Sequence, residues 1–207
     1  MDREMKSIYI GDLKIPVAVI QGGMGIGISL SRLASAVANM GGVGVISTVA
    51  IGLTKENSSN NYRKNNINAL RGEIRKARKM TSGILGVNIM SVITDFSDMV
   101  KASIDEGIDI IFSGAGLPLD LPKYLGDKSR TKLVPIVSSA RAASIITQKW
   151  NQNYGYLPDG FVVEGPKAGG HLGFKSETIW DISNTLENLV SDIARLSDEL
   201  KEKFKKR

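Results

Sequence analysis

The sequence contains no cysteine, so no thiol nucleophile, disulfide or zinc–thiolate site can be built from it. It contains one histidine, His171, which excludes a metal site made of several imidazoles, and we expect no metal. No apolar run approaches the roughly 20 residues that a membrane-spanning helix needs, and the charged start lacks the apolar core of a signal peptide. We therefore expect no membrane partner and a cytoplasmic location.

Aromatic residues are also scarce, at 6%, although the formal net charge is +6. Residues 62–79 carry seven Lys and Arg against one Glu, and the tail 202–207 is basic as well. A nucleic-acid groove interleaves such cations with aromatic side chains, and that pattern is missing here. We expect the basic segments to be solvated helix faces, with cations suited to a helix carboxyl end, and no nucleic-acid partner.

Short apolar runs rich in β-branched residues alternate with amphipathic segments along the whole chain. This alternation is typical of βα units around a parallel sheet, so the sequence predicts an α/β fold with about six such units in a single domain over residues 1–207. The predicted strands cover 17–21, 43–47, 84–90, 108–113, 132–137 and 160–164. The predicted helices cover 29–40, 67–80, 95–106, 121–125, 139–150 and 182–206, and 54–66 is predicted to be a polar surface excursion.

Glycine and polar residues follow nearly every predicted strand. In parallel α/β folds the ligand lies at the carboxyl ends of the strands, and bare backbone there suits a planar or phosphorylated ligand. The run GGMGIG loosely resembles the dinucleotide-binding fingerprint, but Ser47 and Thr48 follow the second strand where that fold needs an acidic residue. The main glycine-rich segments are QGGMGIG (21–27), SGAGLP (113–118) and EGPKAGGHLG (164–173).

Four segments, in this order, resemble the nitronate monooxygenase family, also called 2-nitropropane dioxygenases: IPVAVIQGGMGIGIS, LGVNIM, IIFSGAGLP and FVVEGPKAGGHLG. FMN-dependent enoyl-acyl-carrier-protein reductases are close relatives of that family. The resemblance implies a (β/α)8 TIM barrel that binds FMN at the carboxyl ends of its strands. It also implies oxidation of alkyl nitronates or nitroalkanes with O2, and a small-molecule substrate.

The resemblance further implies which residues contact the cofactor. The first loop would run beside the flavin, and the amide of Asn88 would hydrogen-bond it. Each position has a structural alternative: a tight turn for the glycines, a satisfied core amide for Asn88, and an ion pair with a lysine for Glu164. The predicted cofactor-binding residues are Gln21, Gly22, Gly23, Met24, Asn88, Glu164, Gly169 and Gly170.

His171 is predicted to be catalytic. It follows Ala168, Gly169 and Gly170 at the end of a predicted strand, where an imidazole packed in a core is unexpected. Imidazole can take up or release a proton at neutral pH. By the resemblance, it would act as a base on the carbon beside a nitro group or orient the nitronate anion.

The sequence has no counterpart of the family's seventh and eighth strands, whose turns carry the phosphate site in barrels of this kind. We therefore expect an incomplete TIM barrel that lacks the main anchor of FMN and associates with itself through its open edge. Two hypotheses follow. The chain is an FMN-dependent nitronate monooxygenase, with an enoyl reductase as the alternative enzyme, or it is a non-catalytic partial barrel that cannot hold FMN alone.

Overall fold

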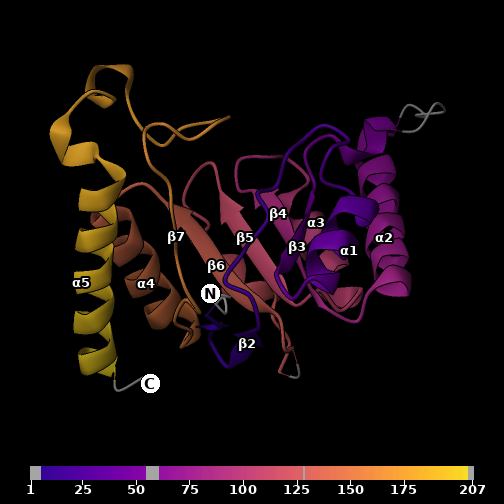
Figure 1. Cartoon of the computed structure of the whole chain (residues 1–207), viewed down its shortest axis with the longest axis horizontal. Helices are drawn as coiled ribbons and strands as arrows, with labels where there is room; N and C mark the ends of the chain where they lie inside the picture. Colours follow the sequence, from indigo (N-terminus) through magenta and orange to yellow (C-terminus); the bar gives the residue numbers. More distant parts are fainter. Residues whose placement is uncertain (1–5, 55–60, 128, 205–207) are drawn as a thin grey trace, which may run out of the picture.

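A computed structural model describes residues 6–54, 61–127 and 129–204. Five parallel strands form one sheet in chain order, and their carboxyl ends point toward the upper edge of Figure 1. The strands are β3 (Val43–Ser47), β4 (Ile84–Met90), β5 (Ile110–Gly114), β6 (Lys132–Val137) and β7 (Val162–Val163).

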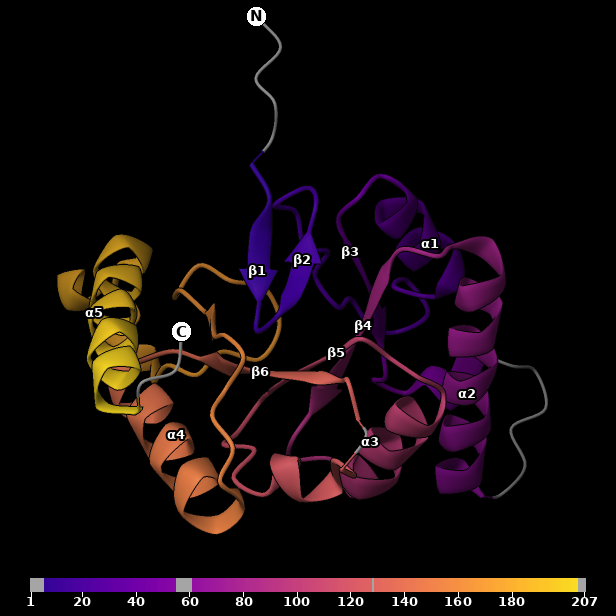
Figure 2. The ribbon, with the colours of Figure 1, turned by 90° about the horizontal axis from the view of Figure 1, so that it is seen from below.

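Helices form an outer arc around this curved sheet, as Figure 2 shows from below. The fold is therefore a mixed α/β fold with a partial sheet of the (β/α)8 barrel type, as predicted. The α-helices are α1 (Ser31–Asn39), α2 (Tyr62–Met80), α3 (Phe96–Asp105), α4 (Ala140–Tyr154) and α5 (Leu186–Phe204). The 3-10 helices are η1 (Ile51–Thr54), η2 (Leu121–Tyr124), η3 (Ser176–Thr178) and η4 (Ile182–Asn184).

A hairpin that the sequence did not predict closes the lower end of the sheet's inner face. Its strands, β1 (Ile8–Ile10) and β2 (Leu13–Ile15), pair antiparallel. Ile10 and Ile15 are buried in one cluster with inward-facing side chains of the strands, including Phe112. Gly86 makes room for this ring, because a Cβ there would lie 2.8 Å from Phe112 Cε2. A second, larger cluster fills the space between the sheet and the helices.

The predicted strand at 17–21 is wrong as a strand, although the segment does lie beside β3. It makes one isolated parallel bridge, between Ile20 and Val43. Val43 N donates to Val19 O, and Gln21 N donates to Val43 O. Val19 and Ile20 are 46% and 38% exposed, so the segment lacks the cover that a central strand has on both faces.

Several predicted boundaries also shift. Helix α2 begins at Tyr62, because the Asn61 side chain accepts a hydrogen bond from Lys64 N; residues 62–66 are therefore helical, and 55–60 lie outside the described residues. Helix α4 continues to Tyr154 and ends at Gly155, which has a left-handed backbone. The predicted helix 182–206 divides into the turn η4 and helix α5.

The basic segment 62–79 coincides with helix α2, and three of its arginines face acidic residues at or just beyond the end of α3. Arg71 and Arg75 both contact Glu106, at 2.9 and 2.6 Å. Arg78 contacts Asp109 at 2.7 Å. These ion pairs neutralise much of the positive charge locally. Among the helices described, none is long and apolar enough to cross a membrane.

Candidate functional site

A cavity of about 1250 Å³ lies at the carboxyl ends of the strands. Its floor includes Asn88, Ile136 and Val162 of three strands. The loop 22–25, which follows the first predicted strand, forms one wall, and segments 164–170 and 179–187, which follow β7, form the other. Residues near the beginning of the chain and residues of its last third therefore line the same cavity.

Ser29 fixes the loop 22–25 from below. It is fully buried, and its hydroxyl accepts a hydrogen bond from Met24 N at 2.9 Å and donates one to Gly22 O at 3.1 Å. A third bond joins the same hydroxyl to Gln21 Nε2 at 2.9 Å. These contacts hold the backbone of Gly22 and Met24 at the edge of the cavity.

The side chain of Gln21 is engaged within the protein. Its Nε2 donates to Val45 O at 2.9 Å, and its Oε1 accepts from Val45 N at 3.3 Å. Gln21 is absent from the described lining of the cavity. The amide therefore ties the first loop to β3, while the predicted contact of Gln21 with a cofactor stays a prediction.

Asn88 presents its amide to the cavity. Register places it level with Ser47 and Phe112 on the neighbouring strands. Its backbone oxygen accepts from Thr48 Oγ1 at 2.9 Å, but within the described part of the chain its side-chain amide has no hydrogen-bond partner. Gly23 lies against this side chain, because a Cβ at Gly23 would be 2.4 Å from Asn88 Cβ. The structure therefore does not support the alternative in which the Asn88 amide is hydrogen-bonded within the core.

Glu164 closes the loop that contains the histidine. Its Oε2 accepts a hydrogen bond from Gly173 N at 2.9 Å, and Ser138 Oγ donates to Gly173 O at 3.1 Å. A Cβ at Gly173 would lie 2.4 Å from Ser138 Oγ, so this clasp requires a glycine. Sequence analysis missed the clasp and expected a cofactor or a lysine as the partner of Glu164.

Gly169 and Gly170 line the cavity on the loop that this clasp closes. Nothing lies within 4 Å of a Cβ built at either glycine, nor at Gly22 on the opposite wall. These three positions offer bare backbone beside open space. Gly170 also has a φ of +87°, which side chains with a Cβ rarely adopt.

His171 lies beside this cavity and not among its described lining residues. It is exposed and lines a neighbouring cavity of about 540 Å³, together with Ser138 and Ser139 at the start of α4. The two cavities share Ile136 and Glu164. The structure thus brings seven of the eight predicted cofactor residues to one cavity and the predicted base to the next.

The charges of the larger cavity suit a planar polar ring better than a phosphate. Among the described residues that line it, Lys167 is the only cation, against three acidic side chains: Glu164, Asp181 and Glu187. The pKa of the Asp181 carboxyl lies below its ordinary value because the backbone N–H and the hydroxyl of Ser183 both donate to it. A free amide and bare backbone, with little positive charge, suit a planar polar ligand.

The fold and this cavity define a protein of the TIM-barrel class with a ligand site at the carboxyl ends of its strands. A profile of the nitronate monooxygenase family matches residues 6–196. The chain belongs to this family.

Individual relatives agree with this assignment. The chain is similar to the FabK structure from Thermotoga maritima, with 27% identity and a TM-score of 0.62, over 86% of this chain and 47% of that one. Nitroalkane oxidase from Streptomyces ansochromogenes has 17% identity and a TM-score of 0.68, over 88% and 56%, and shows the fold alone.

A curated relative is the (3aS,4S,5R,7aS)-5-hydroxy-7a-methyl-1-oxo-octahydro-1H-indene-4-carboxyl-CoA dehydrogenase of Mycobacterium tuberculosis. It is 27% identical over 161 residues, which are 78% of this chain and 39% of that protein. The chain spans about half the length of its solved relatives and less of this curated one.

Proposed function

We propose that this chain supplies the flavin-ring site of an FMN-dependent oxidoreductase that acts on nitronates or nitroalkanes with O2. The observation that carries the proposal is the free amide of Asn88 facing the same cavity as the bare backbone of Gly22, Gly169 and Gly170. An amide offers both a donor and an acceptor, as the edge of a flavin ring requires. Bare glycine backbone lets a planar ring approach closely.

When bound, the flavin would accept the electrons taken from the substrate and pass them to O2. The chain's own residues would position ring and substrate. An imidazole nitrogen of His171 would accept the proton from the carbon that bears the nitro group. His171 would reach the larger cavity past Ile136 and Glu164, which line both cavities. With a preformed nitronate no proton is removed, so His171 would only orient the anion.

The test is flavin binding to Gly22→Ala, Asn88→Leu and a matched control, Gly72→Ala. A Cβ at Gly22 or at Gly72 meets nothing within 4 Å in the protein, so both alanine variants should fold. We expect quenching of flavin fluorescence to report weaker binding for Gly22→Ala and Asn88→Leu and unchanged binding for Gly72→Ala. Equal affinity in all three variants would refute the ring site.

The reaction is tested separately on protein saturated with FMN. O2 uptake with a nitronate, without a nicotinamide cofactor, is the expected result. Nicotinamide oxidation driven by an enoyl thioester would instead indicate the reductase alternative. Flavin binding without either activity would favour the non-catalytic partial barrel.

A further inference from the structure

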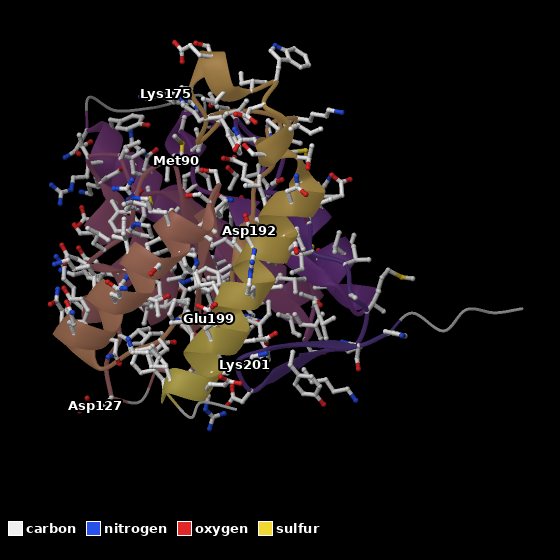
Figure 3. All side chains as sticks on the ribbon, turned by 90° about the vertical axis from the view of Figure 1, so that its left-hand side faces the viewer. Met90, Asp127, Lys175, Asp192, Glu199 and Lys201 are labelled. Carbon is white, nitrogen blue, oxygen red and sulfur yellow. The ribbon has the colours of Figure 1, made fainter. Side chains whose placement is uncertain are left out.

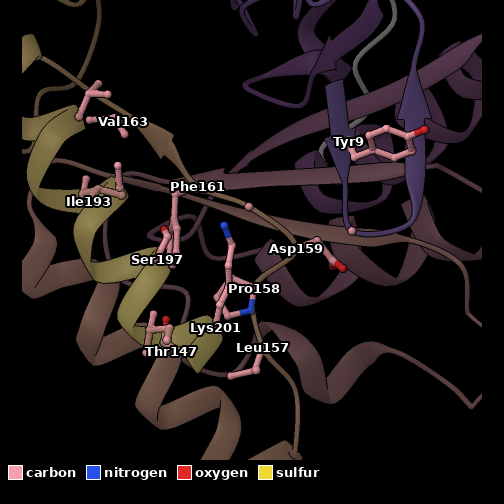
Figure 4. Close-up of a pocket in the computed structure, with 15 residues that line it drawn as sticks. Tyr9, Thr147, Leu157, Pro158, Asp159, Phe161, Val163, Ile193, Ser197 and Lys201 are labelled. Atoms are coloured by element: carbon pink, nitrogen blue, oxygen red, sulfur yellow. The ribbon is translucent and has the colours of Figure 1, made fainter. Parts of the chain in front are cut away.

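An apolar groove of about 500 Å³ runs along the free side of β7, between helix α5 and residues 157–161 (Figure 4). In the described sheet β7 has β6 as its one neighbour, so its other side is an edge. Leu157, Phe161 and Val163 line the groove on the sheet side. Edges and apolar grooves of this kind are sites of association.

Helix α5 carries a stripe of mostly apolar residues that borders this groove and the larger cavity. Leu186, Val190, Ile193, Ser197 and Leu200 follow one another at intervals of four, three, four and three residues, the spacing of a helix that packs against another helix. Leu189 and Ile193 are 5% and 4% exposed and pack into the protein. Leu186 and Val190, by contrast, are 48% and 46% exposed.

Exposed apolar side chains continue into the segment that precedes helix α5. Trp180 and Ile182, which line the cavity of about 1250 Å³, are 89% and 81% exposed. Large apolar side chains exposed in a row, next to an apolar groove, are unusual on a surface that faces only water. The same stripe therefore borders both the groove and the cavity.

We propose that a second copy of this chain covers the stripe, with the two α5 helices antiparallel and related by a two-fold axis near Ala194. Ala194 and Ser197, which both line the groove, are small enough to let two helices approach closely. A two-fold contact pairs each position with its mirror position on the other helix. Exposed Val190 of each copy then lies against Ala194, Ser197 and Lys201 in the groove of the other.

Charge supports this arrangement. Glu187 and Lys201 flank the stripe, and each lies seven residues from Ala194, so the two-fold axis brings Glu187 of one copy to Lys201 of the other. Lys201, labelled in Figure 3, contacts Asp198 on its own helix at 3.2 Å. Both of those side chains are exposed, and an exposed pair of this kind exchanges partners readily.

The mass in solution tests the proposal first. We expect sedimentation at tens of micromolar to give twice the 22.3 kDa of one chain. Val190→Glu should give a monomer with an unchanged circular dichroism spectrum, because Val190 is half exposed, while Glu199→Lys, on the face of α5 away from the groove, should remain a dimer. A monomeric parent, or a dimer that Val190→Glu leaves intact, would overturn the proposal.

Charge reversal tests the orientation. Glu187→Lys and Lys201→Glu should each weaken the dimer, because each places like charges opposite one another across the two-fold axis. The double variant should restore the dimer, since the two exchanged charges then attract each other in trans. Additive weakening in the double variant would overturn the antiparallel arrangement.

A cysteine provides the closest test, because the chain has none of its own. Ala194→Cys should form a disulfide-linked dimer under mild oxidation, since a bridge requires two Cα atoms within about 7 Å of each other. Glu199→Cys, five residues later and about 140° further round the helix, should not. Equal cross-linking of both variants would place the contact elsewhere and contradict the proposal.

Discussion

His171 is the chain's single imidazole, and it lies beside the candidate flavin cavity on a loop that Glu164 and Ser138 close at Gly173. In protein saturated with FMN, we predict that His171→Asn lowers the turnover of a neutral nitroalkane by about 10²–10⁴-fold, the usual effect of losing a general base. Turnover of the preformed nitronate should fall much less, because no proton is removed. Steady-state kinetics on both substrates would exclude a role as base if the two rates fell equally.

Two adjacent glycines should differ sharply in what they tolerate. Gly23→Ala puts a Cβ 2.4 Å from Asn88 Cβ, so the first loop must shift. Forcing an extra methyl group into a packed site costs about 1–3 kcal/mol. Gly22→Ala meets nothing within 4 Å and should leave the free energy of unfolding within about 0.5 kcal/mol of the parent. Urea unfolding measures both, and equal losses would show that Gly23 and Asn88 are not in close contact.

Sequence patterns predicted the residues that line the cavity better than those that hold the loops. Asn88 was predicted from the segment LGVNIM, which resembles the family. The clasp of Glu164 on Gly173 joins residues nine positions apart through a loop closure that has no periodic signal. The three bonds of Gln21 likewise depend on how the first loop folds over β3.

Among the elements, β3, β4 and β6 begin and end where the sequence predicted. Most residues of these strands are buried, as expected for the apolar runs of a parallel sheet covered by helices. The hairpin β1–β2 escaped prediction because its strands have three residues each, too few to show an alternating pattern. The first predicted strand failed because the segment makes only one isolated bridge to β3 and its apolar side chains Val19 and Ile20 remain partly exposed.

The pairing of α2 with α3 should make stability depend on pH. Hydrogen bonds from Arg75 and Arg71 hold the pKa of Glu106 below its ordinary 4.5, although burial acts in the opposite direction. A carboxyl with a lowered folded pKa stabilises the protein above about pH 4.5, and this contribution disappears as the pH falls through the folded pKa.

Glu106→Gln should therefore lower the free energy of unfolding at pH 7, and the gap to the parent should narrow as the pH falls below about 4.5. Glu199→Gln, on the exposed side of α5, is the matched control and should change little at either pH. Denaturant unfolding at a series of pH values measures the gap. A gap that stays constant, or widens in acid, would contradict the ion pairs.

At the scale of the whole molecule, the candidate site depends on the curvature of the sheet. The loop 22–25 and the segments 164–170 and 179–187 lie far apart in sequence and meet only because the strands between them form part of a barrel. The central claim is that this site binds the ring of a flavin.

Binding of riboflavin and FMN to the purified chain tests that claim most directly. Because the described lining offers Lys167 against three acidic side chains, we predict similar dissociation constants for the two flavins, within about a factor of ten, and weaker binding of both to Asn88→Leu. A phosphate cradle of about three charge-assisted hydrogen bonds would favour FMN by roughly 10³-fold or more. Such a preference would contradict the proposed ring-only contact, and no binding of riboflavin at all would contradict the flavin site itself.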